Sequence, residues 1–142
     1  MKKVMAFGSF DILHPGHVDY LGRAKRLGDY LIVVVARSDS IKRIKGRAPF
    51  FDDRERLRMV GSLGVVDRAI LGNPMRNPDD KYAIIREYRP DIVVFGYDQR
   101  VDVAEVRDWL RRKGIGARVV KLRHGLRPRR YKSSRIRGAL ER

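Results

Sequence analysis

The chain has 142 residues, of which 43% are hydrophobic, and this size and composition fit a single domain over residues 1–142 with a core of its own. No apolar run approaches the roughly 18 residues that a membrane span needs, and Met1-Lys2-Lys3 leads directly into an apolar run, so we expect a cytoplasmic protein without a signal peptide. The net charge of +16 is large for this size, the absence of cysteine excludes disulfides and thiolate-bound zinc, and three histidines are too few for an imidazole metal centre.

The first predicted elements lie in residues 4–28, VMAFGSFDILHPGHVDYLGRAKRLG. The apolar run 4–7, bounded by Gly8, has the length of a buried strand. Pro15 suits the first turn of a helix, where its fixed φ is favourable and its missing N–H is not needed. Apolar residues at helical spacing then continue to Gly28. The stretch predicts a strand, a tight turn over residues 8–11 and a helix that follows His14.

The later segments repeat this alternation. Strands are predicted over 29–36, 65–71, 91–95 and 117–122, and helices over 52–61, from Asp79 or Asp80 to Tyr88, over 103–113, and from Ser133 or Ser134 onward. The polar, basic stretch 38–52 contains Gly46 and Pro49 and predicts a mobile loop. This spacing favours an α/β fold, a Rossmann-like doubly wound parallel sheet of five strands. Such sheets bind ligands beyond the carboxyl ends of their strands, which gathers residues 8–17, 38–52, 96–99 and 123–134 at one edge.

His14 and His17 are three positions apart at the predicted helix start, so both imidazoles share one helix face. Unpaired N–H groups and the positive end of the helix dipole attract anions there. Each ring can donate a hydrogen bond or carry a positive charge toward a phosphate, and Gly16 leaves room for a ligand to approach the backbone. The alternative is one surface and one capping histidine at an ordinary turn, but the whole pattern favours an anion site.

The segment GSFDILHPGHVDYLGRAKRLGDYLIV closely resembles the opening of the HxGH nucleotidyltransferases. This cytidylyltransferase-like group includes glycerol-3-phosphate cytidylyltransferase and the archaeal FAD synthases, and the resemblance runs through the whole chain. It implies that His14 and His17 are catalytic and bind the nucleotide. It also implies nucleotide contacts from four further positions, of which Ser9 stands where the group usually has Thr. These positions are Gly8, Ser9, Phe10 and Gly16.

Two cationic positions outside this opening extend the resemblance. In the family a lysine of the loop after the second strand reaches the phosphates, which implies that Lys45 is catalytic, with Lys42 as second candidate. The alternative for this loop is a solvated run of charge. Arg56 matches a Glu-Arg pair whose arginine usually faces the ligand, and its alternative is an ordinary surface position on a helix.

The segment that precedes the last predicted helix, YKSSRIR at 131–137, resembles the family signature Ile-Ser-Thr-Thr-x-Ile-Arg/Lys. Ser133 and Ser134 match the two threonines and are implied to bind phosphate, although a serine N-cap would give the same pattern. Lys132 replaces the serine that usually precedes them. Arg127 has the offset of an upstream family arginine that binds the nucleotide, and Arg129 and Arg130 are close enough to take its place.

The segment Gly96-Tyr97-Asp98-Gln99 ends a predicted strand at the binding edge. Asp98 is placed to accept a hydrogen bond from a ribose hydroxyl or an exocyclic amine, and Tyr97 and Gln99 are further candidates. Glycerol-phosphate cytidylyltransferases usually read Gly-Asp-Asp-Trp here, whereas GYDQ is similar to the archaeal FAD synthases. A flavin needs a flat apolar slot, for which the sequence offers four aromatic residues. These are Phe10, Phe50, Phe51 and Tyr97.

The resemblance implies a nucleotidyltransferase in which a phosphate oxygen of the acceptor attacks the α-phosphorus of ATP or CTP and pyrophosphate leaves. The implied reaction is ATP with FMN giving FAD, and the alternative is cytidylyl transfer from CTP to glycerol 3-phosphate or another polyol phosphate. Mg²⁺ or a similar ion is expected on the nucleotide phosphates rather than on a protein ligand set. Similar proteins are often dimers, which leaves a homodimer as one option.

Three interpretations compete for the net charge: binding of nucleic acid, binding of small polyanions such as nucleotides, and a host that favours charged surfaces. The last two rank higher because the arginines are dispersed. An RNA-binding module would have dispensable histidines and steeply salt-dependent affinity, but it lacks a recognition motif here. An aminoacyl-tRNA synthetase shares the His-x-Gly-His element but needs a far longer chain. Asp11 is expected to shape the turn.

Overall fold

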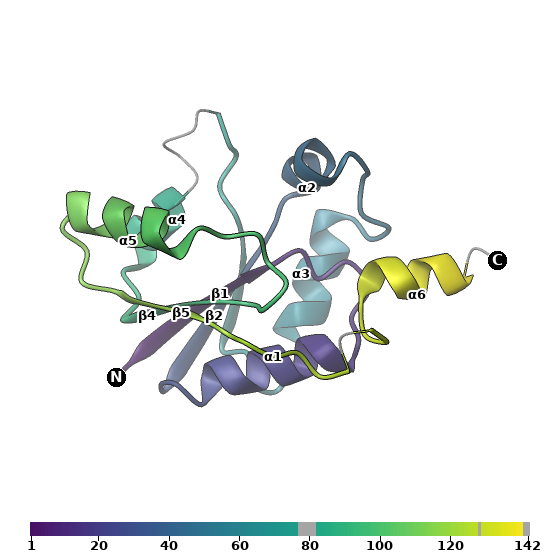
Figure 1. The fold of residues 1–142 in the computed structure, drawn as a ribbon, viewed down its shortest axis with the longest axis horizontal. Helices are drawn as coiled ribbons and strands as arrows, with labels where there is room; N and C mark the ends of the chain where they lie inside the picture. Colours follow the sequence, from purple (N-terminus) through teal and green to yellow (C-terminus); the bar gives the residue numbers. More distant parts are fainter. Residues whose placement is uncertain (77–81, 128, 141–142) are drawn as a thin grey trace.

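The computed structural model describes residues 1–76, 82–127 and 129–140 and contains a five-stranded, all-parallel sheet in the order β3-β2-β1-β4-β5 (Figure 1). The strands are β1 (Lys3–Gly8), β2 (Tyr30–Val35), β3 (Arg68–Leu71), β4 (Ile92–Phe95) and β5 (Arg118–Lys121). The helices are α1 (Pro15–Lys25), α2 (Ser38–Lys45), α3 (Asp53–Gly61), α4 (Ala83–Tyr88), α5 (Val103–Arg112) and α6 (Ser133–Leu140). This architecture confirms the predicted α/β fold.

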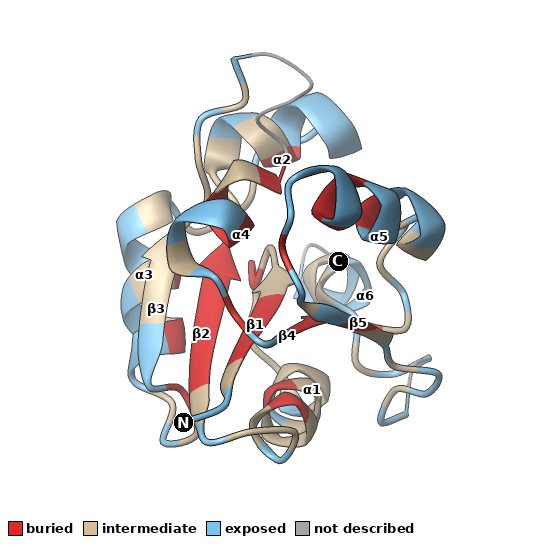
Figure 2. Cartoon of the chain, turned by 90° about the vertical axis from the view of Figure 1, so that its left-hand side faces the viewer, coloured by how far each residue is buried: buried red, intermediate tan, exposed pale blue. Residues whose placement is uncertain are grey.

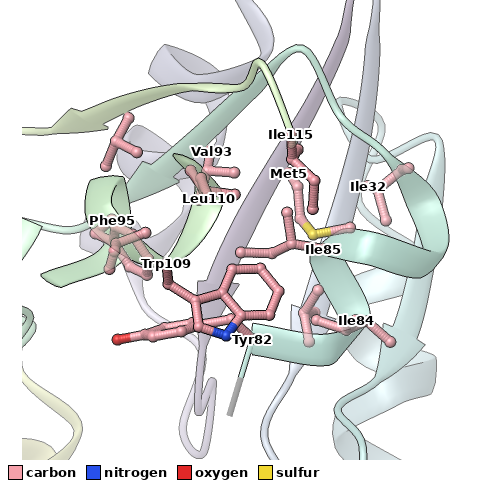
Figure 3. Packing of buried hydrophobic residues seen from close by; sticks show 13 residues of the cluster. Met5, Ile32, Tyr82, Ile84, Ile85, Val93, Phe95, Trp109, Leu110 and Ile115 are labelled. Carbon is pink, nitrogen blue, oxygen red and sulfur yellow. The ribbon is translucent and has the colours of Figure 1, made fainter. Parts of the chain in front are cut away.

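Both faces of the sheet are covered, which explains why its central strands are continuously apolar. Successive side chains of a strand point to opposite faces. Val4 and Ala6 of β1 accordingly pack with α1 and α3, whereas Met5 packs with α4 and α5. Figure 2 shows the buried residues concentrated in β1, β2 and β4, and Figure 3 shows the cluster around Met5 and Trp109. Among the described residues no helix is long and apolar enough to cross a membrane.

The strand order changes direction between β1 and β4. From β1 the chain passes outward to β2 and β3, then crosses back to β4 and β5 on the other side. The carboxyl ends of β1 and β4 therefore form the switch point at which parallel sheets of this type bind ligands. In Figure 1, α2 and α6 lie beyond these strand ends and α1 begins there.

The prediction of a loop over residues 38–52 is wrong for its first half, because Ser38–Lys45 forms α2. Lysine and arginine are good helix formers, and Ile41 anchors the helix by burying its side chain. Gly46, at φ 75°, ends the helix in the left-handed conformation that glycine adopts without strain. The predicted start of the fourth helix at Asp79 or Asp80 lies outside the described residues.

Candidate active site

The site begins where β1 and β4 separate. Their pairing ends before Phe7, which leaves the backbone groups of that residue without a strand partner on this side. The Tyr20 hydroxyl lies 2.9 Å from the Phe7 carbonyl and 3.1 Å from the Val94 carbonyl, and accepts from the Phe7 N–H at 3.2 Å. Gln99 donates from Nε2 to the Phe7 carbonyl at 2.9 Å. Tyr20 and Gln99 thus hold the strands apart, so the Gln99 carboxamide is engaged in the fold.

Phe10 folds back into the core instead of lining a ligand slot. Its φ of 50° turns the chain, and its ring packs against His17 and Tyr20 at centroid distances of 5.3 and 6.4 Å. A Cβ on Gly8 would lie 2.6 Å from this ring, so only glycine fits there. Because Phe10 is only 2% exposed, its ring cannot line the flavin slot for which the sequence offered it, and a nucleotide could contact this position only through its backbone.

The side chains of His14 and His17 both cap backbone N–H groups at the start of α1. The Nδ1 atom of His14 accepts from the Gly16 N–H at 3.1 Å, and the Nδ1 atom of His17 accepts from the His14 N–H at 3.3 Å. An imidazole nitrogen that accepts carries no proton, so each neutral ring holds its proton on Nε2. The rings are stacked at a centroid distance of 3.8 Å. Capping and anion binding are therefore compatible, because capping uses only the Nδ1 atoms and leaves both Nε2–H groups for an anion.

Both histidines are neutral at physiological pH. Burial, the nearby His14 ring and the Lys45 ammonium together lower the pKa of His17 to about 3. Burial also lowers the pKa of His14, while the carboxylate of Asp98 opposes that shift. The pair therefore presents two N–H donors to an anion rather than two positive charges. Of the two ways in which a histidine can bind a phosphate, hydrogen bonding by a neutral ring applies here, and attraction by a charged ring does not.

Lys45 supplies the positive charge that the imidazoles lack. Its Nζ lies 3.3 Å from the Ser9 hydroxyl, and its field contributes to the lowered pKa of His17. α2 thus carries Lys45 to the edge where the turn after β1 and the start of α1 meet. Lys42 is exposed on the same helix, and the described structure shows no contact of its side chain with Ser9 or the histidines.

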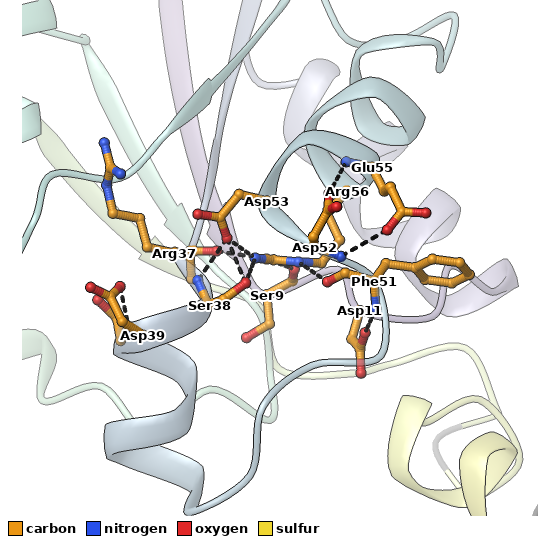
Figure 4. A network of polar contacts seen from close by, with 12 residues as sticks. Ser9, Asp11, Arg37, Ser38, Asp39, Phe51, Asp52, Asp53, Glu55 and Arg56 are labelled. Atoms are coloured by element: carbon orange, nitrogen blue, oxygen red, sulfur yellow. Dashed lines mark hydrogen bonds and ion pairs between the residues drawn. The ribbon is translucent and has the colours of Figure 1, made fainter.

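Arg56 is fully buried beneath the site (Figure 4). Its five N–H groups donate to the carbonyls of Phe51, Ser9 and Ala36, to the Ser38 hydroxyl and to Asp53, over distances of 2.6–3.1 Å. With all five donors used, Arg56 has no N–H left for a ligand. The expectation of a ligand-facing arginine is therefore wrong, as is its surface alternative: Arg56 joins the turn after β1 to the segments that flank α2.

Asp11 attaches α6 to the same turn. It accepts from the Phe51 N–H at 3.1 Å and forms an ion pair with Arg137 of α6. Ser133, at the start of α6, donates from its hydroxyl to the Ile12 carbonyl at 2.9 Å. Asp11 therefore does more than shape the turn, as predicted for it, and its partner Arg137 is a site residue that the sequence reasoning missed. The Ile-Arg end of the signature at 131–137 was the available signal.

The segment before α6 lies against His14 and Gly16. The Tyr131 ring stacks near His14 at a centroid distance of 6.1 Å, and its Cβ would lie 3.2 Å from a Cβ on Gly16, so glycine permits this close approach. Ser134 is exposed and lines a hollow of about 410 Å³ with three cations. The lining residues are Arg129, Lys132, Ser134 and Arg135. Arg127 does not line this hollow; it is exposed at φ 43°, and its carbonyl accepts from the next turn.

Tyr97 and Asp98 border the site from the end of β4. Tyr97 packs against Gly125, where an added Cβ would lie 2.0 Å from the ring. Asp98 is exposed; its charge opposes the lowering of the His14 pKa, and burial together with this charge raises the pKa of Tyr97. Among residues 1–76, 82–127 and 129–140, no group of three carboxylate, imidazole or thiol side chains could hold a metal ion.

The model of the cytidylyltransferase-like family matches residues 5–139 of this chain. An FAD synthase from Aciduliprofundum boonei is 48% identical over 123 residues, covering 87% of this chain and 79% of that protein. An FAD synthase from Thermoplasma acidophilum is 47% identical, covering 86% of this chain and 82% of that protein.

Two solved structures are similar. A Thermoplasma volcanium crystal structure, described as a lipopolysaccharide core biosynthesis protein, has a TM-score of 0.79 and 45% identity, covering 86% of this chain and 96% of that chain. Thermotoga maritima TmcAL bound with alpha-thio ATP has a TM-score of 0.72 over 99% of this chain and 50% of that chain. At 14% identity, TmcAL supports the fold alone.

Proposed function

This chain belongs to the cytidylyltransferase-like family, and we propose from this membership and from its site that it is an FAD synthase, which transfers AMP from ATP to FMN. The observation that carries the FMN assignment is the 46–48% identity to proteins named FAD synthase over more than four fifths of the chain. The observation that supports nucleotidyl transfer is the pair of neutral N–H donors at the switch point of the sheet.

In the reaction, a phosphate oxygen of FMN attacks the α-phosphorus of ATP. The new P–O bond forms as the bond from the α-phosphorus to the bridging oxygen breaks, and pyrophosphate leaves with the electron pair. His14 and His17 donate from Nε2 to the α-phosphate oxygens, on which charge accumulates in the transition state. Their neutral state suits this role, because a donor fixed by the fold needs no proton transfer to act. No covalent enzyme intermediate is required.

The leaving pyrophosphate is held by cations from two elements. Lys45 approaches from α2 and binds the β- and γ-phosphates. At the start of α6, Ser134 and Arg129 bind phosphate oxygens, whereas the Ser133 hydroxyl is already engaged by Ile12. Asp98 accepts from the ribose or the base at the end of β4. A divalent ion on the phosphates, when bound, neutralises part of their charge, and phosphate oxygens and water supply its ligands.

The test incubates the purified protein with Mg²⁺ and four substrate pairs: ATP with FMN, CTP with FMN, CTP with glycerol 3-phosphate, and ATP with riboflavin. Chromatography measures FAD, and an enzymatic assay measures pyrophosphate. We expect FAD and pyrophosphate from ATP with FMN, less product with CTP, and none with riboflavin, which lacks the attacking phosphate. Product from CTP with glycerol 3-phosphate and none from FMN would replace FAD synthesis by polyol-phosphate cytidylyl transfer.

Two variants test the role of the histidine pair in the same assay. His17→Asn keeps an oxygen where Nδ1 accepts from the backbone but removes the Nε2 donor, and we expect turnover to fall by about 10² or more, which corresponds to about 3 kcal/mol. His17→Gln keeps a donor near the Nε2 position and is expected to retain more turnover than His17→Asn. The same 10² loss is expected for His14→Ala. Near-normal turnover in His14→Ala or His17→Asn would contradict the phosphate role.

A further inference from the structure

The segment between α2 and α3 exposes an aromatic pair beside the site. Phe50 is 73% exposed, and its ring contacts that of Phe51 edge to face, with centroids 5.0 Å apart and an interplanar angle of 86°. An exposed phenylalanine on a surface loop is not unusual by itself. The way in which this loop is fastened to the site is what gives the pair a function.

The peptide of Phe51 is held from both ends by buried charged side chains. Its N–H donates to Asp11 at 3.1 Å, and its carbonyl accepts from Arg56 at 3.0 Å. Asp11 is 8% exposed and Arg56 is fully buried, so neither anchor is free to move away. Arg56 also donates to the Ser9 carbonyl at 2.8 Å, which fixes the Phe51 backbone relative to the turn that leads from β1 to the histidines. Figure 4 shows the Phe51 ring directed away from the arginine.

We propose that the exposed Phe50 ring, supported edge to face by Phe51, forms the wall against which the isoalloxazine ring of FMN stacks, an inference that rests on the proposed FAD synthase function. A flat, conjugated, uncharged ring gains most from a rigid aromatic surface, because ordering that surface costs little entropy on binding. The other two aromatic candidates from the sequence are less suitable. The Phe10 ring is in the core, and Tyr97 is packed against Gly125 next to the charge of Asp98.

The experiment measures FMN and ATP binding separately, FMN by quenching of its own fluorescence and ATP by calorimetry. The variants are Phe50→Ala, which removes the stacking surface, and Phe50→Tyr, which keeps it. Leu140→Ala is the control, because Leu140 is 76% exposed and lies at the end of α6. For Phe50→Ala we expect FMN affinity to fall about tenfold, the loss typical of one aromatic stacking partner. Phe50→Tyr, Leu140→Ala and all ATP affinities are expected to stay within about twofold of wild type.

Riboflavin provides a second probe, because it has the same ring without the phosphate. Its affinity is expected to fall by the same factor as that of FMN in Phe50→Ala. Unchanged FMN affinity in this variant, or equal losses for FMN and ATP, would overturn the aromatic wall. The wild-type FAD assay separates the two proposals: FAD synthesis with unaffected Phe50→Ala removes only the wall, whereas no reaction of wild type with FMN removes the function as well.

Discussion

The neutral state of His17 predicts a pH dependence of stability that can be calculated and measured. Its pKa is about 3 in the folded protein, against an ordinary value of 6.5 that the unfolded chain adopts. Because the folded pKa is the lower one, the unfolded state binds the proton first, and the stability tied to neutral His17 is fully present above pH 6.5 and is lost as the pH falls toward 3. Integrating the two titrations from pH 7 to pH 5 gives a loss of about 2 kcal/mol.

The matched variant is His17→Asn, which keeps the backbone cap and has no titratable group. The assay is guanidinium unfolding at pH 7 and pH 5, followed by the fluorescence of Trp109, which is the single tryptophan and is buried. From pH 7 to pH 5, the free energy of unfolding of the wild-type protein should fall by about 2 kcal/mol more than that of His17→Asn. Titrating groups that do not contact His17 cancel in the comparison, and the pKa of His14 is lowered by burial and raised by Asp98 rather than shifted by a charge on His17. Equal losses would show that folded His17 titrates near its ordinary pKa, so that it would meet phosphate as a cation at mildly acidic pH.

Three further predictions concern neighbours of the histidines. Lys45→Ala should raise the KM for ATP severalfold in steady-state assays and leave FMN binding unchanged. The control Lys2→Ala, at an exposed position in the N-terminal segment, should have the kinetics of wild type. Identical kinetics for the two variants would make Lys45 a surface charge without a role in ATP binding. Arg56→Met should lower the free energy of unfolding by about 3–5 kcal/mol, because five hydrogen bonds and a paired charge are lost. The control Arg58→Met, at an exposed position, should lower the free energy of unfolding by less than about 0.5 kcal/mol. Gly8→Ala should lower the free energy of unfolding by about 1–3 kcal/mol, because the added Cβ would lie 2.6 Å from the Phe10 ring. The control Gly64→Ala, with open space around the added Cβ, should leave the free energy of unfolding unchanged. A Gly8→Ala protein as stable as wild type would mean that the Phe10 ring can move.

Several features of the fold follow from local patterns in the chain. The alternation of apolar runs and helical periods predicts the five parallel strands, because buried strands and amphipathic helices differ in their hydrophobic period. Pro15 and the two histidines mark the start of α1, and their spacing places both rings on one face. The difference at α2 is also local in origin, because a glycine after a basic run is compatible both with a loop and with the end of a helix, and Gly46 ends a helix.

The properties that decide the chemistry arise only when distant segments meet. Neutral His17 depends on burial and on Lys45, which is 28 positions away, and Arg56 is buried because Ser9, Ala36 and Ser38 converge on its five donors. The ion pair of Asp11 with Arg137 joins the two ends of the chain. Desolvation and hydrogen-bond saturation depend on three-dimensional surroundings, which a residue's sequence neighbours do not specify. The sequence alone therefore determines where the site's residues stand, and only the tertiary structure decides which of them are charged, engaged or free to meet a ligand.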